Sequence, residues 1–124
     1  TAEGVAEALQ ISAGDVLVCS TGLIGEQLDR DALLSGVAAA AAGLGPHGDA
    51  AARAIMTTDS VSKTVVVEGP GYTIGGMAKG AGMLAPGLAT MLVVLTTDAD
   101  LPAAELDRAL RAATRVSFDR LDSD

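Results

Sequence analysis

An apolar run, MLVVL at residues 91–95, is the feature that most constrains the fold of this 124-residue chain. Odd and even positions are both apolar, so a strand formed here would be apolar on both faces. Such a strand is stable only where other layers cover it on each side. The preceding segment, residues 78–89, consists mainly of glycine, alanine and other small or apolar residues. We therefore expect a layered structure in which a flexible loop leads into a buried strand.

Hydrophobic periodicity and turn residues predict the remaining elements. The sequence GPG at residues 69–71 separates two β-branched or apolar runs, which predicts a hairpin. The order of elements predicts an α/β fold, a layered sandwich with a mixed sheet flanked by helices, forming a single domain over residues 1–124. We expect helices over 1–9, 31–44, 49–56 and 102–118, and strands over 16–20, 64–68, 72–77 and 90–99.

Composition narrows the classes of function. Hydrophobic residues make up 49% of the chain but aromatic residues only 2%, so a core must be built from small aliphatic side chains. The net charge of −8 argues against non-specific binding of nucleic acid. No segment has the length of a membrane span or the pattern of a signal peptide. The single cysteine, Cys19, lies in an apolar setting that suits a buried, reduced thiol, and we expect a cytoplasmic protein.

Two short clusters contain candidate binding groups. Thr21 and Gly22 follow the expected strand at 16–20, and a strand-to-turn junction can direct two backbone N–H groups at a developing oxyanion. The ordinary interpretation of this junction is a plain turn. The sequence MTTD at residues 56–59 offers two hydroxyls and a carboxylate to a polar substrate, although such residues also end helices.

Lys79 lies among glycines in GGMAKGAG and is able to approach a substrate carboxylate closely. The alternative is an exposed lysine on a glycine-rich turn. A phosphate-binding loop requires Ser or Thr after its lysine, and Gly80 follows here, so the sequence does not support nucleotide binding. The single histidine, His47, lies in a turn, and we expect no metal site.

Thr90 stands between the small-residue loop and the apolar run. A threonine within a chain is a poor nucleophile because its hydroxyl has no base. Cleavage of the Ala89–Thr90 bond would free an α-amine with a pKa of about 7.7–8.0, low enough for that amine to act as the base. The alternative is a β-branched residue at the start of a strand.

Five motifs in this order resemble the ornithine acetyltransferases, the bifunctional glutamate N-acetyltransferases of the cyclic arginine pathway. The resemblance covers nearly the whole chain, and the eleven-residue step from Lys79 to Thr90 matches the family. Each motif is weak alone, whereas five in order are specific. The motifs are STGLIG (20–25), AIMTTD (54–59), GGMAKGAGMLAP (75–86), ATML (89–92) and FDRLDSD (118–124).

The resemblance implies a self-processing enzyme with a sandwich like that of the N-terminal-nucleophile hydrolases, cleaved between Ala89 and Thr90. Thr90 would then accept the acetyl group of N-acetylornithine and pass it to glutamate. Thr21 and Gly22 match the oxyanion-hole positions of the family. Its substrate-binding positions match Thr57, Lys79 and Thr90.

The resemblance also implies no resident cofactor, with acetyl-CoA as an additional donor in the bifunctional branch. Expected partners are the two amino-acid substrates and the rest of the chain's own precursor, as α and β chains in a heterotetramer, without nucleic acid or membrane. We expect this chain to be the central part of a longer enzyme and inactive by itself. The alternatives are a relative serving specialised metabolism, a self-processing aminopeptidase or amidohydrolase, and a non-catalytic domain whose acidic surface binds a protein.

Overall fold

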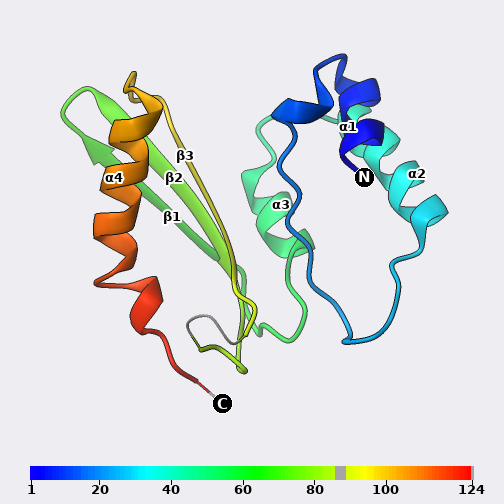
Figure 1. The fold of residues 1–124 in the computed structure, drawn as a ribbon. Helices are drawn as coiled ribbons and strands as arrows, with labels where there is room; N and C mark the ends of the chain where they lie inside the picture. Colours follow the sequence, from blue (N-terminus) through cyan, green and yellow to red (C-terminus); the bar gives the residue numbers. More distant parts are fainter. Residues whose placement is uncertain (86–88, 124) are drawn as a thin grey trace. The chain divides into compact units, whose positions relative to one another are not determined.

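The computed structural model of the chain describes residues 1–85 and 89–123 (Figure 1). The chain divides into two compact units, Thr1–His47 and Gly48–Asp124, and each is described by itself. The single domain expected over residues 1–124 stays a prediction. The first unit contains α1 (Ala2–Leu9), the 3-10 helix η1 (Ala13–Asp15) and α2 (Arg30–Ala42). The second contains α3 (Gly48–Ala54), β1 (Lys63–Gly69), β2 (Tyr72–Lys79), β3 (Leu92–Thr97), α4 (Ala103–Thr114) and the 3-10 helix η2 (Phe118–Arg120).

In the first unit, α1 packs against α2. Leu34 of α2 approaches Gly4 so closely that a Cβ at Gly4 would lie 2.6 Å from the Leu34 Cδ2 atom. The helix α2 begins at Arg30 because the Asp29 carboxylate accepts the N–H groups of Asp31 and Ala32, at 3.0 and 2.9 Å. Its alanine-rich sequence then favours the helix throughout.

The segment between η1 and α2 contradicts one prediction. Residues 16–20 do not form a strand, and residues 16–29 have no helix or strand. Leu17 and Ile24 are 93% and 96% exposed, and Cys19 is exposed rather than buried. A strand needs a neighbour for its N–H and C=O groups, and both regular elements packed together in this unit are helices. The segment is apolar in sequence, but it is exposed and no strand in this unit pairs with it.

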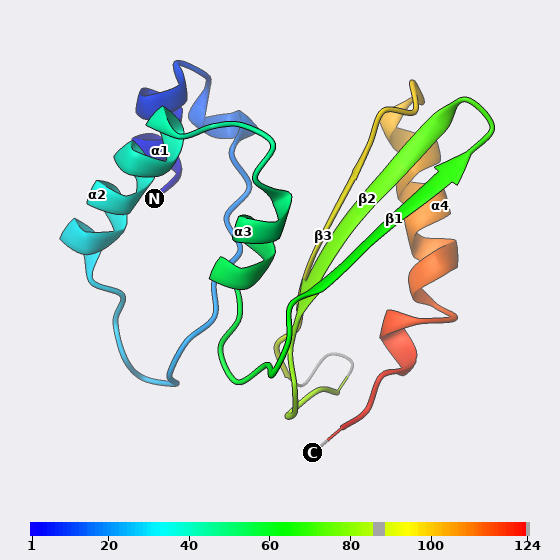
Figure 2. The same ribbon diagram turned by 180° about the vertical axis from the view of Figure 1, so that it is seen from behind.

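The second unit is built on an antiparallel sheet with the order β1-β2-β3 (Figure 2). The expected hairpin is confirmed, with β1 paired to β2 from Lys63 opposite Ala78 to Gly69 opposite Tyr72. Pro70 and Gly71 form the two-residue loop, and Gly71 has a φ of +81°, which suits glycine at the third position of a type II turn. The expected mixed sheet is wrong for the described residues, because both strand pairs among them are antiparallel.

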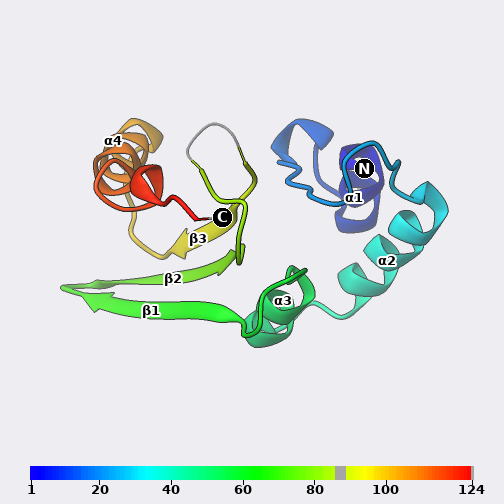
Figure 3. The ribbon, with the colours of Figure 1, turned by 90° about the horizontal axis from the view of Figure 1, so that it is seen from below.

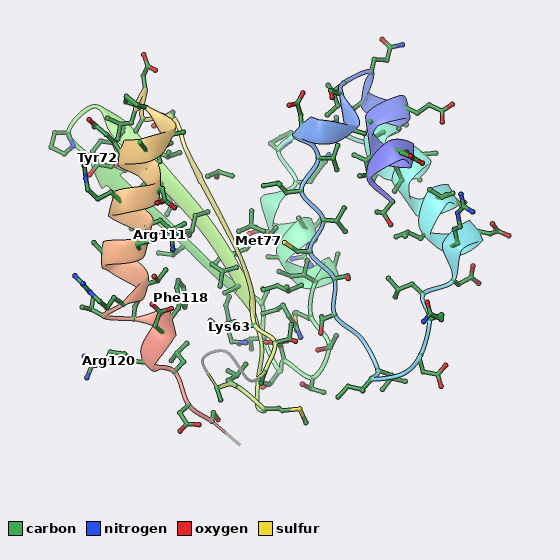
Figure 4. The ribbon with its side chains drawn as sticks, in the orientation of Figure 1. Lys63, Tyr72, Met77, Arg111, Phe118 and Arg120 are labelled. Carbon is green, nitrogen blue, oxygen red and sulfur yellow. The ribbon has the colours of Figure 1, made fainter. Side chains whose placement is uncertain are left out.

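Helical elements lie on both faces of this sheet (Figure 3). Residues of α3 share a hollow of about 290 Å³ with Val66 and Met77 on one face. On the other face, Phe118 lies beside Val65 and Leu95, and its ring points toward the strands (Figure 4). The α/β class is therefore confirmed in its coarse form, as a combination of helices and a three-stranded sheet.

The sheet is less covered than the sequence predicts. Val66 of β1 is 70% exposed, and Val94 and Leu95 of β3 are about half-exposed. The helix α3 has seven residues, so it is only about 10 Å long and cannot cover three strands. The expected burial of the apolar run on both faces is thus only partly reached in this chain.

Candidate functional site

Lys79 is the last residue of β2, and the structure buries it. It is only 5% exposed, so the alternative of an exposed lysine on a turn is wrong. Its Nζ atom donates a hydrogen bond to the Thr57 Oγ1 atom at 2.7 Å, which joins two of the three predicted substrate-binding residues. In the part of the chain that the structure describes, no carboxylate oxygen lies within 4.0 Å of the Lys79 ammonium.

Asp59 lies beside this pair, with its side chain fully buried. Its Oδ1 atom forms an ion pair with Lys63 and accepts the N–H of Gly80 at 2.7 Å. Its Oδ2 atom accepts the N–H of Thr57 at 3.4 Å. One carboxylate therefore joins the loop before β1, the first residue of β1 and the residue after β2.

These contacts set the charge of Asp59. The hydrogen bond from Lys63 is the main cause that holds the pKa of the Asp59 carboxyl well below its usual range, and the N–H groups of Gly80 and Thr57 act in the same direction. Burial alone would raise this pKa, but the hydrogen bonds outweigh it. Asp59 is thus an anion at neutral pH.

Gly80 makes the close contact to Asp59 possible. Its φ of +139° lies in a region that other residues rarely adopt. A Cβ atom at this position would also lie 2.8 Å from the Cδ2 atom of Leu84. A glycine is therefore required where the chain leaves β2 and turns its N–H toward the carboxylate.

Thr90 is exposed and lies outside regular structure. The prediction that a strand begins at Thr90 is wrong, because β3 begins at Leu92, which pairs with Lys79. Before the predicted cleavage point, the N–H of Ala89 donates to the Ala85 carbonyl at 3.2 Å, and residues 86–88 lie outside the described ones. Thr90 thus stands two residues before the cross-strand partner of Lys79.

The predicted oxyanion pair, Thr21 and Gly22, belongs to the first unit and lies in its irregular segment. Thr21 is partly buried and Gly22 is exposed. Within the described residues, neither N–H donates to another group of the chain. The structure therefore brings together Thr57 and Lys79 in the second unit, and the predicted oxyanion pair lies in an irregular segment of the first unit.

Sequence reasoning missed Lys63, the counter-ion of Asp59. It stands four residues after Asp59 at the start of a strand, and its sequence context gives no signal that separates it from a surface lysine. Among the described residues, no cluster of three or more His, Cys, Asp or Glu side chains is placed to bind a metal ion. The helices described here are too short or too polar to cross a bilayer.

The fold and site define a class: an α/β protein in which a buried ammonium group lies at the end of a central strand, bound to a threonine hydroxyl and unpaired with any carboxylate of the described residues. Comparison with known sequences then identifies the family. A model of the ArgJ family matches residues 1–124. The chain belongs to the ArgJ family.

Several bacterial relatives match the whole chain. The "Arginine biosynthesis bifunctional protein ArgJ" of Streptomyces avermitilis is 69% identical over 125 residues, and that of Streptomyces coelicolor is 68% identical. The protein of the same name from Thermobifida fusca is 62% identical. Each match covers 100% of this chain and 33% of the relative, so the chain spans about a third of the length of these proteins. The resemblance found from the five motifs is confirmed.

Proposed function

We propose that the full-length protein containing this chain transfers an acetyl group from N-acetylornithine to glutamate in arginine biosynthesis. The observation that carries the proposal is the buried Lys79 ammonium, held by Thr57 and without a carboxylate partner among the described residues. A buried ammonium is costly unless an anion compensates it. Family membership and the names of the relatives support this choice of reaction.

Lys79 would bind the α-carboxylate of the substrate. N-acetylornithine and glutamate both carry an α-carboxylate, so one cation serves both halves of the reaction. The Thr57 hydroxyl oxygen accepts a hydrogen bond from one N–H of the ammonium, so the other two N–H groups point away from it. Lysine acts as a point charge here, and the remaining contacts to the substrate would come from other parts of the protein.

Thr90 would be the nucleophile. Its hydroxyl would attack the Ala89 carbonyl and displace the Thr90 amide nitrogen, which forms an ester between Ala89 and Thr90. Water would then hydrolyse this ester, which frees the Thr90 hydroxyl and leaves its α-amine as a general base. The Thr90 hydroxyl would then attack the acetyl carbonyl of N-acetylornithine, and ornithine would leave with the proton returned by the base. The α-amine of glutamate would attack the acetyl ester and leave as N-acetylglutamate. The N–H groups of Thr21 and Gly22 would stabilise the oxyanion in each step.

The rest of the protein would complete this machinery. We propose that the other two-thirds of the full-length protein covers the open sheet. Together with this chain, it would form a sandwich like that of the N-terminal-nucleophile hydrolases. The cleaved α and β chains would stay together in a heterotetramer in the cytoplasm, and acetyl-CoA would be a second acetyl donor. The partly exposed strands of the second unit support this arrangement, because they offer apolar surface that a complete fold would bury.

The experiment uses freshly purified full-length protein. The mass of each polypeptide is measured first under denaturing conditions. Two polypeptides are expected, one ending at Ala89 and the other beginning at Thr90. Acetyl transfer is then measured with N-acetylornithine in the presence and absence of glutamate. A single uncleaved piece would contradict the role of Thr90. Ornithine release at the same rate without glutamate would instead indicate a hydrolase.

A further inference from the structure

We infer that Asp59 is a positioning residue, which holds the Thr57–Lys79 pair in the geometry that binds the substrate carboxylate. This inference rests on the function proposed for Lys79. Asp59 itself does not touch the substrate in this scheme. It acts through the two residues that do.

The contacts of Asp59 reach both members of the pair through the backbone. Oδ2 accepts the N–H of Thr57, whose own Oγ1 receives the Lys79 ammonium. Oδ1 accepts the N–H of Gly80, the residue directly after Lys79. Thr57 and Lys79 come from segments that are distant in sequence, and the Asp59 carboxylate fixes both of them at the same point.

The charges around Asp59 support the same role. Lys63 pairs with the carboxylate, so the cluster of Asp59, Lys63 and Lys79 keeps one net positive charge. Because Asp59 is already engaged by Lys63 and two N–H groups, Lys79 stays available for an external anion. The Lys63 side chain is 44% exposed, whereas that of Asp59 is fully buried. The ammonium of Lys63 therefore balances the buried charge of Asp59 from the protein surface.

The opposite end of β2 provides a matched control. Oδ1 of Asp98 accepts the N–H of Thr73 at 2.6 Å, which is the same kind of carboxylate–backbone contact. Asp98 is exposed, and this contact lies at the other end of the strand from Lys79. An Asp98→Asn variant therefore removes a similar contact from the same strand without touching the Thr57–Lys79 pair.

The experiment measures steady-state acetyl transfer by full-length Asp59→Asn and Asp98→Asn enzymes. We expect Asp59→Asn to raise the KM for N-acetylornithine by about tenfold, equivalent to ~1.4 kcal/mol, with a smaller change in kcat. Asp98→Asn should stay within about twofold of the wild-type KM, because its contact to Thr73 lies at the other end of β2 from the Thr57–Lys79 pair. A wild-type KM in folded, cleaved Asp59→Asn enzyme would overturn the inference.

A second variant keeps the inference testable if Asp59→Asn fails to fold. Lys63→Met leaves Asp59 in place but removes its counter-ion, and the methionine fits the half-exposed site of the lysine side chain. Because a buried carboxylate without its partner costs stability, the folded state is verified before the assay. The unpaired carboxylate would then compete with the substrate for Lys79, so the KM should rise again. An unchanged KM in Lys63→Met would overturn the inference.

Lys79→Met separates this inference from the proposed function. If Lys79→Met keeps the wild-type KM, the proposed role of Lys79 fails and the inference about Asp59 fails with it. If Lys79→Met raises the KM but Asp59→Asn and Lys63→Met do not, the proposed function stands and the positioning role of Asp59 is wrong.

Discussion

The two segments that carry the predicted chemistry differ in how the chain supports them. Thr57 and Lys79 are joined by a hydrogen bond, anchored by Asp59 and attached to a sheet. Thr21 and Gly22 lie in a segment without regular structure, flanked by exposed apolar side chains such as Leu17 and Ile24. A hairpin and a nearby carboxylate are enough to build the first arrangement locally. No such anchor is present for the second, whose N–H groups donate to no group of the described residues.

The largest expected effect comes from Thr90→Ala in the full-length protein. The variant lacks the hydroxyl that attacks Ala89 and later carries the acetyl group, so cleavage and transfer should both be abolished. The denatured mass and a transfer assay measure the two losses. Thr64→Ala, on the exposed strand β1, is the control and should cleave normally. Cleavage in Thr90→Ala would show that another residue is the nucleophile.

A smaller effect is expected from Gly80→Ala. The alanine would adopt a strained φ and its Cβ would press on Leu84, so the free energy of unfolding should fall by about 1–3 kcal/mol. Gly22→Ala in the other segment meets no atom within 4 Å and should change stability by less than about 0.5 kcal/mol. Denaturant unfolding of both full-length variants compares the two regions directly. Equal losses would show that the segments are equally constrained.

The free energy of unfolding should depend on pH through the Asp59 carboxylate, which anchors the Thr57–Lys79 pair. Because the pKa of Asp59 is lowered in the folded protein, the unfolded chain binds this proton more readily, and stability rises with pH. The contribution of Asp59 is present above about pH 4 and is lost as the pH falls below it. The difference in thermal midpoint between wild type and Asp59→Asn should therefore shrink on acidification from pH 7 to pH 3.

Asp29 provides the control for the loss of a carboxylate that binds backbone N–H groups. It also accepts two such groups, but at an exposed helix start in the first unit, and asparagine is an equally good cap. At pH 7, Asp29→Asn should therefore change the free energy of unfolding by less than about 0.5 kcal/mol. A pH-independent difference between wild type and Asp59→Asn would contradict the lowered pKa.

The smallest effect is expected from Ile24→Ser in this chain. The side chain is 96% exposed, so its loss removes almost no packing and should change the free energy of unfolding by less than about 0.5 kcal/mol. A larger loss in the full-length protein would show that the rest of that protein covers this segment. Denaturation of both proteins measures the difference. Equal, small effects would show that the segment stays exposed in the complete protein.

The sequence was sufficient for features that depend on local patterns. The hairpin around Pro70 and Gly71 follows from turn chemistry, and α2 follows from its helix-forming alanines and the cap at Asp29. The expected strand at 16–20 failed because an apolar run specifies burial but does not supply a partner. The start of β3 at Leu92 rather than Thr90 was missed for a similar reason, since pairing with Lys79 defines where the strand begins.

The candidate site was predictable in its residue types but not in its organisation. Thr57 and Lys79 were identified by resemblance, and the structure places them in contact. Their common anchor depends on contacts from Asp59 to Lys63 and Gly80, and no spacing in the sequence reveals which of several acidic residues turns inward. Burial of Lys79 was likewise hidden, because a lysine among glycines is typical of an exposed turn.

The pairing of β2 with β3 has a consequence for a protein cut between Ala89 and Thr90. One product would contain β2 and the other β3, so the two would share six cross-strand residue pairs from Ile74–Thr97 to Lys79–Leu92. Leu84 and Ser123, also on opposite sides of the cut, exchange two backbone hydrogen bonds at 2.8 and 2.7 Å. The two products of one chain would exchange partners no faster than the sheet unfolds. In a mixture of two tagged native enzymes, the α chain of one would therefore not pair across this sheet with the β chain of the other.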